Sequence, residues 1–329
     1  MLLSAPFLVL GQQKRQFDQY NKNLMIYNPA ATGMEFFTDV SGNFRRQWTG
    51  FENAPRSFVL GVSSRMMETE YINPNSPYSL YISDNSLYKK VGDPEIKRTP
   101  KPHAIGAFLL DERNGPIHNM SLMGNYAYHL KFSETNYLSL GLGLGISRTS
   151  TDVAELTVIE ENDPTYQNYI THDNSNVYID ANFGLTYYGE NFYAGYSATQ
   201  LRRNHIYKQE NSEDAKLILH HNLAGGYIFH LSETMELYPT VLLRYTDPAP
   251  VEVEASLRMR LDKKIWFGAG YRKDDAVSAQ FGMTISNKLN FGYSYAFSTS
   301  DMRTQNDGTH ELSLGLMIHN SVAAPKLMW

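Results

Sequence analysis

The feature that most constrains the fold is a two-residue repeat of apolar side chains that persists over long runs. In Tyr137–Ser147, leucine or isoleucine occupies every second position from Leu138 to Ile146, and glycine or serine fills the positions between. In a strand these apolar residues form one wall, whereas in a helix they would scatter around the cylinder. The same alternation recurs in Val251–Leu261, Leu289–Phe297 and Leu312–Ile318. The chain is therefore predicted to be all-β.

The length of the runs favours a membrane barrel over a soluble sandwich. We predict strands near 37–48, 56–66, 103–112, 117–131, 136–149, 176–188, 191–200, 217–231, 235–246, 250–261, 265–273, 276–286, 289–299 and 309–319. A soluble strand averages about 5–6 residues, whereas a tilted membrane strand needs about 9–11. The prediction is a transmembrane antiparallel β-barrel of about 14 strands, an even number that is typical of bacterial barrels. A soluble β-sandwich is the rival.

Composition is compatible with this prediction and excludes several other classes. There is no cysteine, which rules out a disulfide scaffold and thiolate metal sites. The net charge of −5 is mild, so nothing points to nucleic acid. The 23 Tyr and 16 Phe suit the aromatic girdles of a membrane barrel. A mean hydropathy of −0.41 does not argue against a barrel, because half of each strand faces a polar interior.

The chain divides into a barrel and its flanking segments. Residues 1–11 resemble the apolar core of a signal peptide, although the basic segment expected before it is missing, which suggests a truncated start. Residues 12–36 are predicted to be a periplasmic N-terminal segment, and 37–319 to be the barrel. An insertion at 67–102 falls on the periplasmic face by strand parity, and 320–329 form a C-terminal tail. Long outer loops are expected at 150–175, 201–216 and 299–308.

Charged residues opposite the apolar faces are expected to point into the lumen. Because buried charges persist when they are paired, these residues are predicted to form an interior network of ion pairs and hydrogen bonds. A solute path with selectivity set by the same charges is the functional alternative. The candidate network comprises Arg45, Asp180, Arg244, Glu252, Glu254, Arg258, Arg260, Arg272 and Glu311.

No motif predicts catalysis, a cofactor or a metal. His220 and His221 are adjacent and would point to opposite faces of a strand, so they are read as structural histidines. The acidic loop Glu160–Asp173 lacks the fixed ligand spacing of a calcium site and is read as a solvated surface loop. We therefore predict no catalytic residue, no cofactor and no metal ligand.

Several motifs in order along the chain resemble the PorP/SprF family of outer-membrane proteins associated with type IX secretion and gliding. They begin with Gln19–Gly33, Gln47–Pro55 and Asp111–Pro116 and continue through much of the second half. The residues that carry the resemblance include Asn28, Pro29, Gly33, Gln47, Trp48, Gly50, Pro55, Tyr271, Arg272, Asp275, Ala276, His310 and Glu311. The insertion 67–102 and the tail 320–329 depart from the family pattern.

The resemblance implies a non-enzymatic outer-membrane component that assists secretion or surface retention of specific cargo proteins. It also implies partners: the periplasmic ring and motor proteins of type IX secretion, secreted cargo with a C-terminal sorting domain, and outer-membrane lipid. A periplasmic contact is expected from 12–36 and 67–102, and a cargo contact from the outer loops. The alternatives are a passive outer-membrane porin or uptake channel and, third, a lipid hydrolase.

Overall fold

A computed structural model describes residues 17–72, 95–153, 175–201, 204–207, 219–286, 288–304 and 306–318. The signal-like segment 1–11 and the tail 320–329 lie outside these residues, as do most of the loops expected at 150–175 and 201–216. Within the described part, no helix is both long and apolar enough to cross a bilayer.

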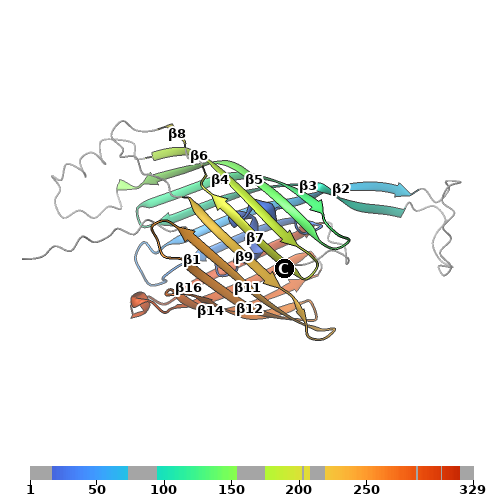
Figure 1. Cartoon of the computed structure of the whole chain (residues 1–329). Helices are drawn as coiled ribbons and strands as arrows, with labels where there is room; N and C mark the ends of the chain where they lie inside the picture. Colours follow the sequence, from blue (N-terminus) through green and yellow to red (C-terminus); the bar gives the residue numbers. More distant parts are fainter. Residues whose placement is uncertain are drawn as a thin grey trace, which may run out of the picture.

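The described strands close into an antiparallel barrel whose wall has 14 strands (Figure 1). The first half of the wall comprises β1 (Thr38–Arg46), β2 (Arg56–Ile72), β3 (Glu95–Asn114), β4 (Ile117–Lys131), β5 (Tyr137–Thr151), β6 (Ser175–Tyr188) and β7 (Phe192–Thr199). The second half comprises β9 (His220–Tyr227) with β10 (Phe229–His230), β11 (Met235–Thr246), β12 (Glu252–Leu261), β13 (Ile265–Arg272), β14 (Ala276–Ile285), β15 (Leu289–Ser298) and β16 (Thr309–Ile318).

Two details of pairing complete the closed wall. β9 and β10 both pair with β11 and act as one wall strand, interrupted at Ile228. β1 pairs with β16, from Thr38↔Ile318 to Arg46↔His310, which joins the first strand to the last. A further short strand, β8 (Asn204–Tyr207), pairs with β6 and lies off the barrel path. The predicted barrel is confirmed.

The apolar face of the wall points outward and the polar face points inward, which is the reverse of the arrangement in a soluble protein. On β5, Leu142 and Leu144 are 59% and 65% exposed, whereas Ser139 on the opposite face is fully buried. On β16, Leu314 is exposed and Glu311 is fully buried. The period-two pattern therefore turns its apolar face outward, which is favourable only against lipid.

The connections differ in length at the two ends of the barrel. Short turns join β4 to β5, β6 to β7 and β12 to β13 at one end, and most of the longer loops lie at the other. One hairpin breaks this rule because β2 and β3 continue together beyond the wall as a two-stranded ribbon, paired as far as Ile72↔Glu95 (Figure 1). The outer parts of the predicted insertion 67–102 are thus strand, and 73–94 lie outside the described residues.

Proline explains where this ribbon leaves the wall. β3 pairs with β4 only as far as His103↔Tyr128, although β4 continues to Lys131. The next residues of β3 away from the wall include Pro102 and Pro100, which have no N–H to donate to a neighbouring strand. Beyond this point β3 keeps its pairing with β2 alone.

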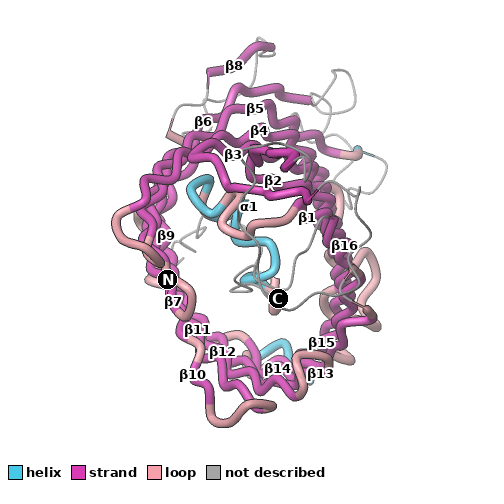
Figure 2. Tube along the Cα trace, turned by 90° about the vertical axis from the view of Figure 1, so that its right-hand side faces the viewer, coloured by secondary structure: helices cyan, strands magenta, loops and turns pink. Residues whose placement is uncertain are grey.

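The N-terminal segment lies inside the barrel. It forms η1 (Tyr20–Asn23), α1 (Leu24–Tyr27) and η2 (Pro29–Ala31), which Figure 2 shows within the ring of strands. The sequence predicts a periplasmic N-terminal segment at 12–36. Residues 12–16 lie outside the described part of the chain, and 17–35 are almost entirely buried and bonded to the wall. We call residues 17–37 the plug. The physical reason is the lumen, whose polar and glycine-lined surface provides partners that a free segment would lack.

Candidate functional site: the plugged lumen

Asn28 joins the plug to the wall and shapes the plug itself. It is the N-cap of η2, where its Oδ1 accepts a hydrogen bond from the backbone N–H of Ala30 at 2.9 Å. Its Nδ2 donates to Thr186 Oγ1 on β6 at 2.9 Å. Pro29 then takes the first position of η2, where a missing N–H costs nothing. The Asn–Pro pair therefore starts a turn and anchors it with one side chain.

Glycines on the wall leave room for this turn. A Cβ added at Gly184 would overlap Asn28 Oδ1, and one added at Gly141 would overlap the backbone of Pro29 and Ala30. At Gly195 a Cβ would come within 2.8 Å of Asn28 Nδ2. Gly141 of β5, Gly184 of β6 and Gly195 of β7 therefore form a seat for the plug, in addition to being small lumen positions.

The end of the plug is fixed to β2 and β4. Gly33 has a positive φ of 70°, and its N–H donates to Ser63 Oγ on β2 at 2.8 Å. His129 Nε2 lies 2.9 Å from the carbonyl oxygen of Thr32, and its Nδ1 lies 2.8 Å from the Tyr188 hydroxyl. Arg65 donates to the same hydroxyl at 2.7 Å. A glycine is favoured at 33 because few side chains accept this backbone conformation.

The start of the plug is held by a buried ionic cluster. Asp18 Oδ1 lies 2.9 Å from Arg45 Nη1 and 2.9 Å from Arg272 Nη2. The backbone N–H groups of Asp18 and Gln19 donate to the two oxygens of Glu311, at 2.7 and 3.0 Å. Each of these side chains is buried, so the pairing offsets a large desolvation cost. We call Asp18, Arg45, Arg272, Glu254 and Glu311 the ionic cluster.

Polar contacts of η1 reach the remaining side of the barrel. Lys22 Nζ donates to Asn290 Oδ1 at 2.9 Å and to Ser313 Oγ at 3.1 Å. The same ammonium lies 4.8 Å from the ring centre of Trp266, a cation–π contact. The Tyr20 hydroxyl donates to Thr240 Oγ1 at 2.9 Å. The plug thus bonds to strands on several sides of the lumen.

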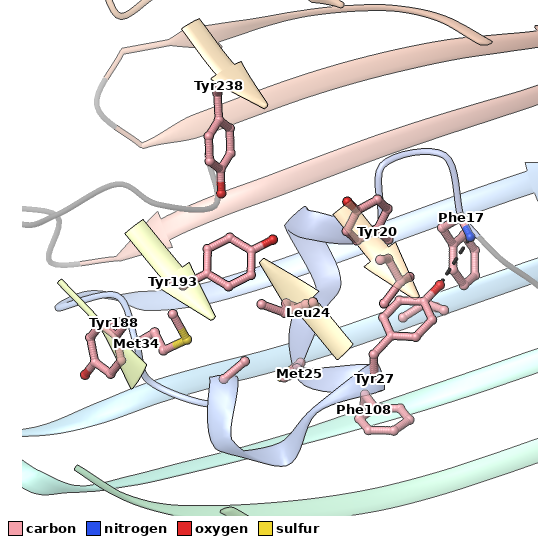
Figure 3. Close-up of a cluster of buried hydrophobic side chains, with 14 of the residues drawn as sticks. Phe17, Tyr20, Leu24, Met25, Tyr27, Met34, Phe108, Tyr188, Tyr193 and Tyr238 are labelled. Atoms are coloured by element: carbon pink, nitrogen blue, oxygen red, sulfur yellow. Dashed lines mark hydrogen bonds between the residues drawn. The ribbon is translucent and has the colours of Figure 1, made fainter. Parts of the chain in front are cut away.

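Apolar side chains fill the middle of the plug (Figure 3). Tyr20, Leu24 and Tyr27 belong to one buried cluster with Phe108 of β3 and with Tyr193 and Tyr238 of the facing strands. The rings of Tyr20 and Tyr27 meet edge to face, with centroids 6.5 Å apart. The plug and the wall therefore share a hydrophobic core inside the lumen.

The nine predicted lumen residues occupy several separate places. Arg45, Glu254, Arg272 and Glu311 meet around Asp18 in the ionic cluster. Arg244 pairs with Glu252, and Arg260 pairs with Glu236, a partner that the sequence reading missed. Arg258 lies 4.5 Å over the ring of Trp266 and donates to Gln280 at 3.0 Å. Asp180 is buried and lines a lumen cavity.

Sequence reasoning did not identify Asp18, Lys22 and Asn28 as residues that bond to the wall inside the lumen. Their segment has no strand periodicity that would indicate which way each side chain points. One signal was present. Gly141, Gly184 and Gly195 all lie on the inward face, and such a group of side-chain-free positions indicates that another backbone approaches closely.

The family-motif residues fall in three groups. Asn28, Pro29 and Gly33 belong to the plug. In the β1–β2 loop, the N–H of Gln47 donates to the Pro55 carbonyl at 2.8 Å, and Trp48 has a φ of 52°. Gly50 also has a positive φ there. These contacts give the motif a turn-forming role.

The third group lies on β13, in the turn to β14, and on β14 and β16. Arg272 pairs with Asp275 at 2.8 Å beside the buried Ala276, and Tyr271 faces outward at 51% exposure. His310 also faces outward, where the Tyr293 hydroxyl lies 2.7 Å from its Nδ1, whereas Glu311 faces the plug.

One cavity that borders the plug is small. A cavity of about 40 Å³ lies among Phe17, Tyr27, Asp180 and Arg244. Ligand pockets usually span about 300–1,000 Å³, so this cavity has room only for a few waters. In the described part of the chain, no group of three or more His, Asp or Glu is arranged to hold a metal ion.

One family of known proteins matches nearly the whole chain. The sequence model of a family described as "Type IX secretion system membrane protein PorP/SprF" matches residues 9–316. No curated protein matches.

Among solved structures, Omp33 of Acinetobacter baumannii has a TM-score of 0.42 at 9% identity, covering 87% of this chain and 99% of its own. The toluene transporter TodX of P. putida has a TM-score of 0.44 at 8% identity, covering 89% and 93%. Likenesses of this degree carry no argument about function.

Proposed function

The chain belongs to the PorP/SprF family of type IX secretion system membrane proteins and is located in the outer membrane, and from this premise we propose its role. We propose that it is a non-enzymatic component that assists the secretion or surface retention of specific cargo proteins. In this proposal the barrel is a membrane-embedded platform for protein contacts and does not itself conduct solutes.

The observation that carries the proposal is the plug. Residues 17–37 occupy the lumen, where they share a hydrophobic core with the wall and form hydrogen bonds with β1, β5, β6, β14 and β16, among other strands. In this proposal, passage of a solute would require the plug to move, which would break the buried ionic cluster. The arrangement supports a platform and counts against the alternative of a passive porin.

The periplasmic contact is proposed to lie on the β2–β3 ribbon. Residues 17–36 are enclosed by the wall, whereas the described ends of the insertion 67–102 extend beyond the wall as paired strands. β1 pairs with β2 only as far as Asp39↔Ser63, so the outer part of β2 has no described neighbour on that edge. Such an edge is suited to pairing with a strand of another protein.

Affinity purification of the native complex from membranes, followed by mass spectrometry, tests this proposal. The wild-type chain is expected to retain type IX machinery subunits and cargo with a C-terminal sorting domain. A variant with 67–102 replaced by a short turn is expected to enter the membrane but to lose periplasmic partners. The matched control is Lys264→Gln, in a turn at the same end of the barrel. A lone barrel, or partners unchanged by the deletion, would contradict the proposal.

A further inference from the structure

Three buried hydrogen-bond donors inside the barrel have no partner among the described residues. They are Nη2 of Arg258 on β12, Nε1 of Trp266 on β13 and Nε2 of Gln19 in the plug. These residues are 5%, 3% and 0% exposed. A buried donor without a partner is costly, and in a native structure it indicates a bound water or ion that completes its hydrogen bonding. We call Gln19, Arg258 and Trp266 the donor cluster.

Arg258 and Trp266 are in direct contact. The guanidinium carbon of Arg258 lies 4.5 Å from the centre of the Trp266 ring, and Arg258 Nε donates to Gln280 Oε1 on β14 at 3.0 Å. The side chain of Arg258 therefore extends across β13, because Arg258 is paired with Gly268 and Gly268 with Gln280. A Cβ added at Gly268 would come within 2.8 Å of Arg258 Cγ, so this glycine leaves room for the arginine.

The side-chain amide of Gln19 lies beside the same indole. A Cβ added at Gly282 of β14 would overlap Cε2 and Cζ2 of Trp266, and Cε2 is the carbon bonded to Nε1. A Cβ added at Gly292 of β15 would overlap Gln19 Oε1 and come within 2.6 Å of Lys22 Nζ, which itself lies 4.8 Å from the Trp266 ring centre. Gly282 and Gly292 are directly paired, so the N–H edge of the indole and the Gln19 amide lie over neighbouring wall positions.

The charge of Arg258 has no carboxylate beside it in the described part of the chain. Arg45, Arg244, Arg260 and Arg272 each pair with Asp or Glu, whereas Arg258 contacts the neutral Gln280 and the Trp266 ring. A buried cation is expensive unless it is paired.

The neighbouring carboxylate is already occupied. Glu311 accepts from the backbone N–H of Gln19, and its oxygens also receive Arg45 Nη1 at 3.2 Å and Asn43 Nδ2 at 3.0 Å. The cation of the donor cluster therefore has to be neutralised by a group from outside the described chain.

The chemistry of the cluster identifies the class of ligand. The guanidinium, the indole N–H and the amide NH₂ donate hydrogen bonds and cannot accept them. A water molecule would accept from such donors, but it would leave the charge of Arg258 unpaired. An anion does both, and the enclosure of the cluster between plug and wall limits it to a small one.

We propose that Gln19, Arg258 and Trp266 form a binding site for a small monovalent inorganic anion, of which chloride is the common example. The anion accepts from Arg258 Nη2, Trp266 Nε1 and Gln19 Nε2, and so it joins the plug to β12 and β13. This site is separate from the ionic cluster and does not rest on the proposed role in secretion.

Bromide titration of the purified full chain, followed by tryptophan fluorescence, tests the site. Bromide resembles chloride and quenches indole fluorescence on contact. The chain has three tryptophans, so W48F/W329F leaves Trp266 as the reporter. With ionic strength held constant by gluconate, quenching is expected to saturate with bromide and to be reversed by chloride. In crystals grown in bromide, an anomalous peak is expected between Arg258 Nη2 and Trp266 Nε1.

Variants in the reporter background assign the binding to the donor cluster. A hydrogen bond from a charged donor is worth about tenfold to a hundredfold in affinity, and R258Q is expected to weaken bromide binding by this factor. R258K keeps the charge and is expected to lose less. Q19L removes the amide donor of the plug without changing the wall, and it is expected to weaken binding roughly twofold to tenfold. The matched control is R244Q, a lumen arginine that pairs with Glu252, and it is expected to bind like the reporter chain.

The outcomes separate an anion from water. Quenching that rises without saturation, or that chloride does not reverse, would show that the donor cluster holds water only and would overturn the site. Absence of the anomalous peak would do the same. Equal bromide affinity of R258Q, Q19L and the reporter chain would overturn the assignment to these residues.

Discussion

Replacing Asp18 by alanine is expected to loosen the plug without unfolding the barrel. The carboxylate of Asp18 receives Arg45 and Arg272 at 2.9 Å each and the hydroxyl of Ser294 at 2.7 Å. Removing one partner from a buried ion pair costs about 3–5 kcal/mol. The lower value applies because Arg45 keeps Glu311, and Arg272 keeps Glu254 and Asp275. About 3 kcal/mol shifts the docking equilibrium on the order of a hundredfold.

A single cysteine reports this shift, because the chain has none of its own. Asn21 is buried in η1, and within the described residues neither of its amide atoms has a hydrogen-bond partner, so Asn21→Cys removes no bond. With Asp18→Ala, a maleimide reagent is expected to label Cys at this position about a hundredfold faster. Asp262→Ala, in an exposed turn, is the control. A labelling rate unchanged by Asp18→Ala would refute the role of the ionic cluster.

Two further variants test the seat and the wall. Gly184→Val places side-chain atoms where Asn28 lies, so it is expected to displace η2 and raise the conductance in planar bilayers. The control is Gly124→Val, whose Cβ would meet only the Leu144 carbonyl oxygen at 3.8 Å, and it is expected to leave the conductance low. Equal conductance of the two variants would contradict the seat. Trp266→Ala removes the ring beneath Lys22 and Arg258, so it is expected to lower the free energy of unfolding in urea by about 3–5 kcal/mol. Phe132→Ala, at a side chain that is 76% exposed, is the control and is expected to change this free energy little.

The wall of the barrel was predictable because the alternation that defines each strand lies within a short stretch of sequence. In β4, β11 and β16, the side of the wall that each residue faces follows from alternation alone, and the strand bounds agree with the predicted ranges 117–131, 235–246 and 309–319 to within a residue. A slip by one residue would expose Glu311 to lipid and bury Leu312, so the register is strongly specified.

The plug was not predictable in the same way, because its position depends on contacts between distant residues. Asp18 meets Arg45 and Arg272, which are far apart in sequence, and nothing in the local pattern of 17–37 indicates burial. Four charges of the ionic cluster, those of Arg45, Glu254, Arg272 and Glu311, were identified from the sequence. Asp18 and the segment that carries it were not. The inward glycines at 141, 184 and 195 were the sequence feature that indicated close approach of another backbone, because they place no side chain in the lumen.

Disulfide formation between the plug and the wall tests the central claim most directly. The Ser41 hydroxyl on β1 donates to Asn23 Oδ1 of the plug at 2.8 Å, whereas Val40 is the neighbouring residue on the lipid-facing side. After mild oxidation in outer membranes, N23C/S41C is expected to yield a disulfide-linked peptide by mass spectrometry, and N23C/V40C is expected to yield none. Free thiols in both variants, or equal linkage in both, would contradict a plug seated inside the barrel.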